Sequence, residues 1–425
     1  MQHDTAFQMA ASNIRFGAGI TGEVGMDLVD MGLRRVMLVI DPALVALPTG
    51  KTVIASLDDN GIDYELFDRV RVEPTDASFQ DAAQFATAGN FDAFVAVGGG
   101  STIDTAKAAN LYSSHPADFL EYVNAPIGRG RPVPGPCKPL IAIPTTAGTG
   151  SETTGVAIFD FVEHHAKTGI AHRFLKPTLG IVDPENTRTL PAAVAAAAGL
   201  DVLCHAMESY TAIPYTARPK PARPIERPAY QGNNPISDLW SMRALEMCRE
   251  SLLQAVAHPE DDHARGQMIL ASALAGIGFG NAGVHLPHGM SYPVAGMVRE
   301  FMPAGYVTDH PIVPHGMSVI LNAPAVVRFT ASACPERHLQ VAAALGADIN
   351  DVDERDAGDI LADTIIDYMQ KLNMPSGLAA VGYTDADIPA LVQGTLPQHR
   401  VTKLAPKPAG EKELASLFAD SLEIW

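Results

Sequence analysis

The chain has 425 residues, of which 47% are hydrophobic and 18% charged, and its 30 Lys and Arg against 48 Asp and Glu give a formal net charge of -18. A single hydrophobic core rarely extends over so many residues, so we expect two domains. The acidic surface repels phosphate backbones, which argues against a nucleic-acid partner. The four cysteines include no C-x-x-C pair, which argues against a disulfide framework or a thiolate metal site.

The first residues, MQHDTAFQMAASNIRFG, have neither the apolar core of a signal peptide nor the Arg-rich, acid-poor composition of a transit peptide. No apolar run reaches the roughly 20 residues that a membrane span needs. We therefore expect a soluble, cytoplasmic protein with no membrane partner.

Up to about residue 190, short apolar runs typical of buried strands alternate with amphipathic helical segments. This alternation predicts a mainly parallel, Rossmann-like sheet covered by helices on both faces. From residue 191 onward the runs have helical length and spacing. We therefore predict an α/β domain over residues 1–188 and an all-helical domain over 189–425. The predicted strands are 36–40, 64–67, 93–97, 139–143, 155–159 and 179–182.

A glycine-rich turn follows the third predicted strand. VAVGGGSTIDTAKAAN, residues 95–110, runs from a strand through three glycines into a helix. Glycine lets the backbone approach a ligand closely, and the N–H groups at a helix start suit a pyrophosphate. Gly98 and Gly100 fit the G-x-G-x-x-G dinucleotide fingerprint, but Ile103 stands where the third glycine belongs. The glycines alone are equally consistent with a tight turn that binds nothing.

Two further strand ends favour a dinucleotide crevice. Asp41 closes the strand 36–40, where a carboxylate can bind a ribose diol and repel a 2′-phosphate, although aspartate is also typical of a turn before Pro42. IPTTAGTGSETT, residues 143–154, follows another strand with hydroxyls that can bind phosphate and amide groups, unless it is only a solvated loop. Three such loops at the ends of separate strands are what a dinucleotide crevice requires.

Candidate metal ligands lie in the second half of the chain. Asp201 and His205 are four residues apart, so they share one face of a helix and can converge on one ion. The sequence PHGM occurs twice, and its histidines, His288 and His315, each stand at the start of an apolar helix. His285 precedes the first of these. Carboxylate and imidazole ligands without a thiolate suit Fe(II) or Zn(II), although each histidine taken singly is more often a packed core residue.

These features together are similar to the iron-containing (group III) alcohol dehydrogenase family. GGGSTIDTAK, IPTTAGTGSETT, the Asp201–His205 pair and the two PHG elements stand in that family's order over essentially the whole chain. The resemblance implies an α/β domain that binds NAD(P), a helical domain that binds the metal, and NAD rather than NADP. The implied metal ligands are Asp201, His205, His288 and His315. The implied cofactor-binding residues are Asp41, Gly99, Gly100, Ser101, Thr145, Thr146, Thr149 and Lys167.

Other segments resemble the hydroxyacid-oxoacid transhydrogenase branch of that family, among them GIGFGNAGVHLPHGMSYPV and QHRVTKLAP. The resemblance implies hydride transfer from 4-hydroxybutyrate to 2-oxoglutarate through NAD that stays bound, giving succinic semialdehyde and 2-hydroxyglutarate. A divalent ion, Fe(II) or alternatively Zn(II), would lower the pKa of the substrate hydroxyl. His288, His315 and His285 are expected at the reacting centre, with His285 beside the ligand set.

The chain departs from the family pattern at Tyr292, where many simpler members carry histidine, and at His399, where this branch is expected to carry glutamate. Both implied substrates are carboxylates and need a cationic anchor. Basic residues crowd into the Pro-rich segment, residues 213–235, and we hypothesise that one or two of them hold the distal carboxylate. Solvated loop charges would give the same pattern. These residues are Arg218, Lys220, Arg223 and Arg227.

Three alternatives stay open. The first is an NAD-dependent dehydrogenase of 4-hydroxybutyrate or another primary alcohol, whose cofactor dissociates at each turnover. The second is a metal- and NAD-using lyase or cyclase of the dehydroquinate-synthase-like kind, which needs a dense basic pocket that the sequence around the histidines lacks. The third, a non-enzymatic NAD sensor, leaves the metal ligands unexplained. We expect small-molecule hydroxy acid and oxo acid partners and a homo-oligomer of two or more copies.

Overall fold

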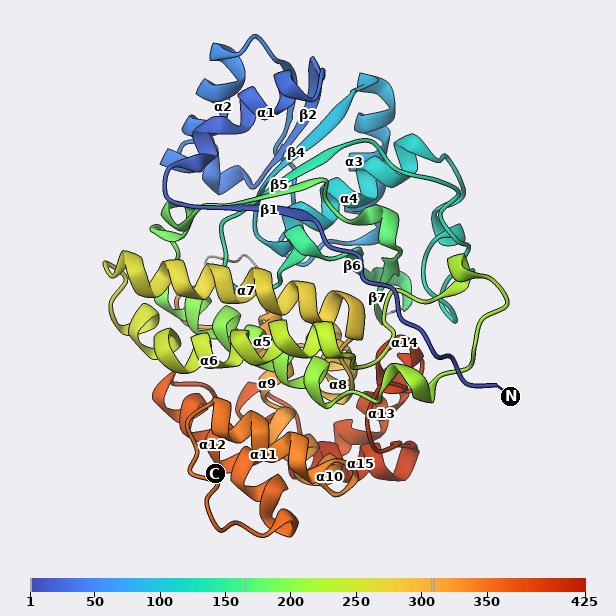
Figure 1. Ribbon diagram of the computed structural model, residues 1–425, viewed down its shortest axis with the longest axis vertical. Coiled ribbons are helices and arrows are strands. Elements are labelled where there is room, and N and C mark those ends of the chain that lie inside the picture. Colours follow the sequence, from blue (N-terminus) through green and yellow to red (C-terminus); the bar gives the residue numbers. More distant parts are fainter. Residues whose placement is uncertain (1, 165, 307, 309) are drawn as a thin grey trace. The chain divides into compact units, whose positions relative to one another are not determined.

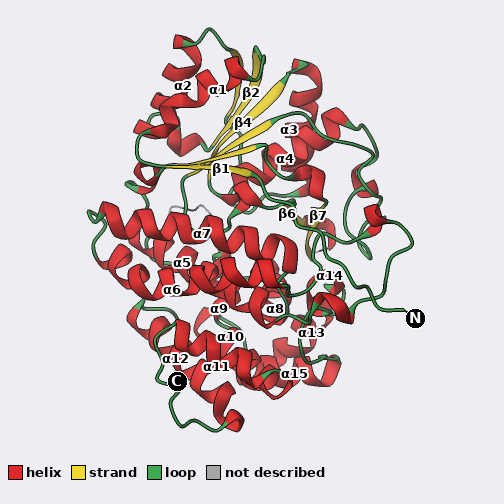
Figure 2. Cartoon of the chain, in the orientation of Figure 1, coloured by secondary structure: helices red, strands yellow, loops and turns green. Residues whose placement is uncertain are grey.

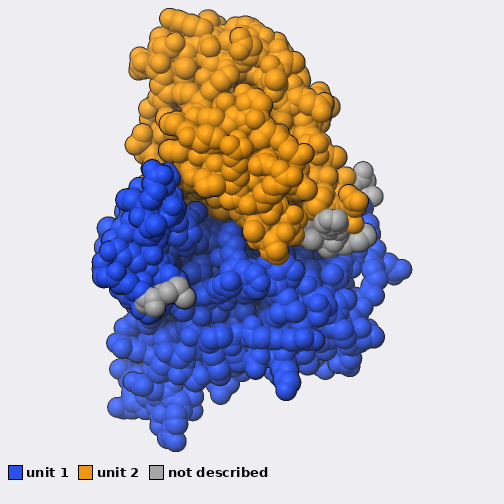
Figure 3. All heavy atoms as spheres, turned by 90° about the vertical axis from the view of Figure 1, so that its right-hand side faces the viewer, with its two compact units in different colours: residues 1–9, 191–425 blue, residues 10–190 orange. Residues whose placement is uncertain are grey.

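The computed structural model describes residues 2–164, 166–306, 308 and 310–425, and the chain divides into two compact units (Figure 1, Figure 3). One unit is Ala10–Leu190, and the other joins Met1–Met9 to Pro191–Trp425. The division lies close to the predicted boundary at residue 188. The first nine residues differ from the prediction, because they belong to the helical unit.

Contacts with the Pro-rich segment explain this placement. The buried carboxylate of Asp4 forms ion pairs with Arg218 at 3.0 Å and with Arg227 at 2.9 Å. Gln231 accepts a hydrogen bond from the backbone N–H of Gln8 and donates one to its carbonyl, at 2.9 and 2.7 Å. A buried carboxylate is costly unless it is paired, so these cations hold the N-terminal residues on the helical unit.

The Ala10–Leu190 unit is a parallel sheet covered by helices, which confirms the predicted α/β class (Figure 2). Its strands are β1 (Asn13–Phe16), β2 (Arg35–Ile40), β3 (Asp63–Phe67), β4 (Ala93–Gly98), β5 (Leu140–Pro144) and β8 (Leu179–Val182). Its main helices are α1 (Val24–Asp30), α2 (Pro48–Asp59), α3 (Asp76–Gly89) and α4 (Gly100–Ser114). All neighbouring strands pair in parallel, in the order β1-β8-β5-β4-β2-β3.

Alternating side chains of the central strands enter two different cores. Leu38 and Ile40 of β2 pack in a core with residues of α1 and α2, whereas Met37 and Val39 pack in a core with residues of α3 and α4. Both faces of β2 are therefore buried, as the continuous apolar run RVMLVI predicts.

Three strands differ from the prediction, because β6 (Val156–Phe161) pairs differently and neither β1 nor β7 (Ala166–Ala171) was predicted. The run 155–159 does form a strand, β6, but it pairs antiparallel with β7 in a separate two-stranded sheet. The pattern of one strand does not encode its partner, so the hairpin was not distinguishable from a sixth parallel strand. The edge strand β1, with the sequence NIRF, has polar residues and two exposed positions, and it lacks a recognisable pattern.

The order of the strands contains a switch point between β2 and β4. Strand β3 lies on one side of β2 and β4 on the other, so the connections leave this point in opposite directions. In open α/β sheets a crevice for ligands forms at the carboxyl ends of the strands where the order reverses. Asp41 follows β2 and the glycine turn follows β4, so both predicted cofactor segments lie at this point.

The second unit is helical, as predicted (Figure 2). Its helices are α5 (Ala192–Thr211), α6 (Pro235–Ala257), α7 (Asp262–Ala282), α8 (Leu286–Gly296), α9 (His315–Ile320), α10 (Ala323–Thr330), α11 (Pro335–Ala344), α12 (Ala357–Lys371), α13 (Ile388–Thr395), α14 (His399–Thr402) and α15 (Glu411–Asp420). Helix α5 packs against α6, α7, α9 and α11, so it is the centre of this unit.

Helix α5 is also long and apolar enough, by length and composition, to cross a membrane. The statement that no such run exists in the sequence is therefore wrong. However, 72% of its most apolar window is buried inside the protein, and its polar residues include Asp201, His205 and Glu208. These features are those of a core helix that carries functional side chains.

Candidate metal centre and cofactor-binding segments

The four implied metal ligands come together in the helical unit. The Nε2 atoms of His205, His288 and His315 lie 3.8, 3.5 and 3.8 Å from Oδ1 of Asp201. All four ligand atoms lie within 4.8 Å of one another. These separations exceed those of ordinary hydrogen bonds. Ligand atoms about 2.1 Å from a tetrahedral ion stand about 3.4 Å apart, so the spacing fits a metal centre.

Unpaired buried atoms provide an independent test of this fit. Oδ1 of Asp201 and Nε2 of His288, which face each other, are buried without a hydrogen-bond partner; Nδ1 of His205 is also unpaired, but it is not the ring nitrogen nearest Asp201. Buried polar atoms are nearly always paired, so orphaned atoms that converge at one place indicate a missing cation. The side chains of these three residues are at most 5% exposed, whereas that of His315 is 28% exposed. The centre is therefore accessible from the His315 side.

Three helices bring the ligands together, and glycines let two of them pack closely. The two ligands on α5 are one turn apart, and the two PHG histidines lie in the first turns of α8 and α9. A Cβ on Gly316 would lie 2.0 Å from the carbonyl oxygen of Ala197 on α5, and a Cβ on Gly289 would lie 2.7 Å from Cγ2 of Thr402. Gly316 therefore lets α9 approach α5, which carries two of the ligands, whereas Gly289 lets α8 approach α14, which carries none.

Glu208 completes the centre, although the sequence analysis did not identify it. Its Oε1 accepts a hydrogen bond from Nδ1 of His288 at 2.5 Å, and its Oε2 accepts the backbone N–H of His285 at 2.6 Å. A carboxylate can only accept, so Nδ1 of His288 carries the proton and Nε2 is left for a metal. Glu208 lies three residues after His205 on α5, and this spacing on the ligand face is the signal that could have predicted it.

Burial and charge set the protonation of these residues. Burial lowers the pKa of His205 to about 3, which keeps the imidazole neutral, the form that binds metals. Burial opposes the charge on His288, but the carboxylates of Glu208 and Asp201 outweigh it and raise its pKa to about 10. Burial likewise opposes the charge on Asp201, but the surrounding histidines hold the pKa of that carboxyl well below its usual range. The two carboxylates thus favour a positive charge at this point.

His285 lies beside the ligand set and not within it. Its Nδ1 accepts a hydrogen bond from the backbone N–H of Leu286 at 2.8 Å, and its Nε2 lies 2.9 Å from Oγ1 of Thr211. Because Nδ1 accepts, Nε2 carries the proton and donates to Thr211. Burial lowers the pKa of His285 to about 4, so the ring is neutral. These contacts hold the start of α8, and the role of His285 in catalysis stays a prediction.

The predicted cofactor segments adjoin one another at the switch point of the sheet. The backbone N–H of Asp41 donates to Val97 of β4 at 3.2 Å, and the N–H of Thr145 donates to Gly98 at 3.1 Å. The carboxylate of Asp41 accepts a hydrogen bond from the N–H of Ala43 at 2.9 Å, so it caps the following turn. The three strand ends are thus joined in the arrangement that a dinucleotide crevice needs.

The glycine turn and the hydroxyl-rich loop are in close contact. A Cβ on Gly99 would lie 3.2 Å from Cγ2 of Thr146, and a Cβ on Gly100 would lie 2.7 Å from Cγ2 of Thr149. Helix α4 begins at Gly100, and the first N–H groups of a helix have no partner within it. Ser101, the next residue, accepts a hydrogen bond from the N–H of Glu73 at 3.3 Å. This turn can therefore bring backbone donors to an anionic group.

Three predicted binding residues are engaged by other side chains. Lys167, on β7, is buried and forms ion pairs with Glu73 and, at 3.0 Å, with Asp160. Its proposed contact with the cofactor stays a prediction. Of the four basic residues in the Pro-rich segment, Arg218 and Arg227 are paired with the buried Asp4. Asp4 carries one negative charge, so it holds both guanidiniums in place but balances the charge of only one of them.

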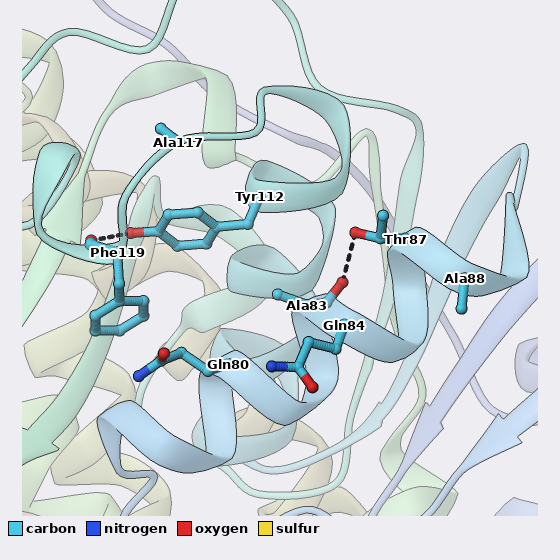
Figure 4. Close-up of a pocket in the computed structure, with 8 residues that line it drawn as sticks. All are labelled: Gln80, Ala83, Gln84, Thr87, Ala88, Tyr112, Ala117 and Phe119. Carbon is cyan, nitrogen blue, oxygen red and sulfur yellow. Dashed lines mark hydrogen bonds between the residues drawn. The ribbon is translucent and has the colours of Figure 1, made fainter.

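A pocket of about 420 Å³ lies elsewhere, on the outer side of α3 and α4 (Figure 4). Gln80 and Thr87 of α3 line it, together with Tyr112 and Phe119. Its one acid–base group among these is the phenol of Tyr112, which donates to the carbonyl of Phe119 at 2.5 Å. Burial raises the pKa of that phenol well above its usual value, so the pocket offers no group for proton transfer.

Two family models match this chain. The model described as iron-containing alcohol dehydrogenase matches residues 11–184, and the model of the C-terminal part of the Fe-containing alcohol dehydrogenase family matches residues 225–422. The first match lies in the Ala10–Leu190 unit and the second in the helical unit, and residues 185–224 lie between them.

Characterised relatives agree along nearly the whole chain. The mitochondrial hydroxyacid-oxoacid transhydrogenase of Bos taurus is 59% identical over 424 residues, which are 99% of this chain and 91% of the relative. That of Homo sapiens is 58% identical over the same shares. The expectation of a cytoplasmic protein is contradicted by these relatives, which are named mitochondrial. It depended on the composition of the first residues alone, which does not determine the compartment.

Solved structures share the fold. A 1,3-propanediol oxidoreductase has a TM-score of 0.85 and 27% identity, and it covers 98% of this chain and 100% of its own. A sulfoacetaldehyde reductase from Bifidobacterium kashiwanohense in complex with NAD+ has a TM-score of 0.81 and 26% identity, covering 99% of this chain and 100% of its own.

Proposed function

Because the chain belongs to the iron-containing alcohol dehydrogenase family, and within it to the hydroxyacid-oxoacid transhydrogenase branch, we propose that it transfers a hydride from 4-hydroxybutyrate to 2-oxoglutarate through tightly bound NAD. The products are succinic semialdehyde and 2-hydroxyglutarate. The chain is an oxidoreductase that acts on hydroxyl groups. The observation that carries the proposal is the convergence of Asp201, His205, His288 and His315 in a chain so similar to these relatives.

These four residues would hold a divalent metal, and their oxygen and nitrogen donors, with no thiolate, fit Fe(II) as well as Zn(II). We propose Fe(II), which agrees with the name of the family. When bound, such an ion stabilises negative charge on a substrate oxygen and polarises a carbonyl. Glu208 holds the ring of His288 in the tautomer that leaves Nε2 for the ion, and Phe279 stacks on the ring of His205 at 3.9 Å.

The cofactor would be NAD, placed at the switch point of the sheet. The turn Gly99–Ser101 offers backbone donors for its phosphates, and Asp41 at the end of β2 offers a carboxylate for a ribose diol. A carboxylate there would repel a 2′-phosphate, which favours NAD over NADP. When bound, the nicotinamide accepts and returns the hydride, and the protein residues orient it and exclude water.

Retention of the cofactor distinguishes this proposal from its main alternative. If NAD stays bound after the first half-reaction, only a second substrate can remove the hydride, and the kinetics are ping-pong. An ordinary dehydrogenase of the same family would instead exchange NADH for NAD at every turnover.

The test uses purified, desalted protein with 4-hydroxybutyrate and 2-oxoglutarate and no added NAD. We expect many turnovers of 2-hydroxyglutarate per protein chain. Product that forms only when NAD is added would indicate the dehydrogenase. No product under either condition would contradict both functions.

A further inference from the structure

Arg400, which contacts Tyr292 of the ligand-bearing helix α8, pairs with no carboxylate in the described part of the chain. Arg400 lies on the short helix α14, in a stretch from residue 388 to residue 410 that contains no Asp or Glu. Nη1 of its guanidinium is buried and has no hydrogen-bond partner. Among the described residues, no carboxylate forms an ion pair with it. A buried cation without a partner is costly, so this one is expected to meet an anion from outside the chain.

Two aromatic residues hold the guanidinium in place. Nη2 of Arg400 donates a hydrogen bond to the hydroxyl of Tyr292 at 2.8 Å, and its Cζ lies 4.9 Å from the centre of the Tyr230 ring. Burial opposes the charge of Arg400, but both phenol groups favour it and raise its pKa above the usual value. The cation is thus oriented and charged, and the residue as a whole is only partly buried.

Both aromatic contacts lead directly to the metal centre. Tyr292 lies one turn after His288 on α8, about 6 Å along the helix axis. The ring of Tyr230 lies 6.4 Å from that of Phe279, which itself stacks on His205. Helix α14 packs on α8. The guanidinium is therefore fixed, through two separate paths, to two of the four metal ligands.

We infer that Arg400 binds the carboxylate of the substrate that lies away from the reacting carbon. The inference rests on the proposed function, and it deepens that function. In 4-hydroxybutyrate, three carbon–carbon bonds separate the reacting carbon from the carboxylate carbon. The same three bonds separate the reacting carbon of 2-oxoglutarate from its distal carboxylate. One fixed guanidinium at a set distance from the metal centre therefore serves both half-reactions, and its forked donors match a carboxylate.

The same reasoning weakens the earlier hypothesis about the Pro-rich segment. Arg218 and Arg227 of that segment share the buried carboxylate of Asp4, whereas no carboxylate of a described residue pairs with Arg400. Tyr292, where the sequence departs from the family pattern that it resembles, also acquires a role, because its hydroxyl orients the arginine.

The experiment measures binding of glutarate, an unreactive five-carbon dicarboxylate, to the holoenzyme by calorimetry. We expect Arg400→Gln to weaken this binding by about 10- to 100-fold, the usual effect of losing a charge-assisted hydrogen bond. In the full reaction, the KM values of both 4-hydroxybutyrate and 2-oxoglutarate should rise together while kcat changes little. The control Arg243→Gln removes an exposed cation of α6 and should leave binding unchanged.

Several outcomes would overturn the inference. One is that Arg400→Gln, at equal metal content, binds glutarate with an affinity within twofold of that of the wild type. Another is that Arg223→Gln, and not Arg400→Gln, loses affinity for glutarate. If Arg400→Gln does not fold, Arg400→Lys replaces it, because it keeps the charge and loses the fork; unchanged affinity would again contradict the inference. A wild-type protein that binds glutarate through Arg400 but forms no 2-hydroxyglutarate would refute the proposed function and leave the anchor intact.

Discussion

Replacing Glu208 by glutamine tests whether the metal centre depends on the carboxylate behind His288. The two oxygens of Glu208 face only donors, namely Nδ1–H of His288 on one side and the backbone N–H groups of His285 and His288 on the other. A glutamine offers one oxygen and one NH2 group. In either orientation of the glutamine amide, its NH2 group faces one of these N–H donors in a buried site, so both donors are left unpaired.

The expected size of the effect follows from these contacts. Leaving a buried donor unpaired costs about 1–3 kcal/mol, and losing a carboxylate partner of a metal-binding histidine costs about 10- to 100-fold in metal affinity. We therefore expect Glu208→Gln to fold, to melt at a lower temperature, and to bind Fe(II) or Zn(II) at least about 10-fold more weakly than the wild type.

The assay is a competition titration of the metal-stripped protein against a colorimetric chelator, with the melting temperature measured in parallel. Glu246→Gln on the exposed face of α6 is the matched control, since Glu246 pairs only with Arg243 at the surface in the described structure. If Glu208→Gln retained wild-type metal affinity, the carboxylate would have no part in orienting His288, and the reasoning would fail.

Three further results are expected. His288→Ala should lose the metal, whereas His285→Ala should retain it, as measured by elemental analysis; the reverse would exchange their roles. Gly316→Ala should be strongly destabilised and metal-poor, because its Cβ would meet a carbonyl of α5 at 2.0 Å, while Gly22→Ala, with 3.7 Å of space, should melt like the wild type. Burial lowers the pKa of His338 to about 4 in the folded protein, whereas the pKa of an unfolded-state histidine is about 6.5. The contribution of neutral His338 to the free energy of unfolding is therefore fully present above about pH 6.5 and falls as the pH drops toward about 4. Denaturant unfolding at pH 7.5 and at pH 5 should therefore show that the free energy of unfolding falls by about 2 kcal/mol more in the wild type than in His338→Gln. An equal fall in both proteins would contradict this.

Local patterns in the sequence were sufficient for much of the fold and of the ligand set. Helical spacing identifies Asp201 and His205, and the repeated PHGM identifies His288 and His315, because each of these signals lies within a few residues. The continuous apolar runs identify five strands of the sheet for the same reason.

Features that depend on distant partners were not predictable in this way. The strand at 156–161 pairs with its neighbour in a hairpin and not with the main sheet, and no local pattern encodes that choice. The first nine residues join the helical unit because Asp4 pairs with arginines more than 200 positions away. Arg400 gains its environment from Tyr292, 108 residues earlier, so its lack of a carboxylate partner among the described residues becomes visible only in the structure.

The central claim is that the hydride passes between two acids through NAD that does not leave the protein. The most direct measurement supplies 4-hydroxybutyrate deuterated at C4 together with 2-oxoglutarate and an excess of unlabelled NADH in solution. If NAD stays bound, we expect 2-hydroxyglutarate to carry the full deuterium label at C2. A product that carries mainly hydrogen from the dissolved NADH would show that the cofactor exchanges at each turnover, and it would contradict the account.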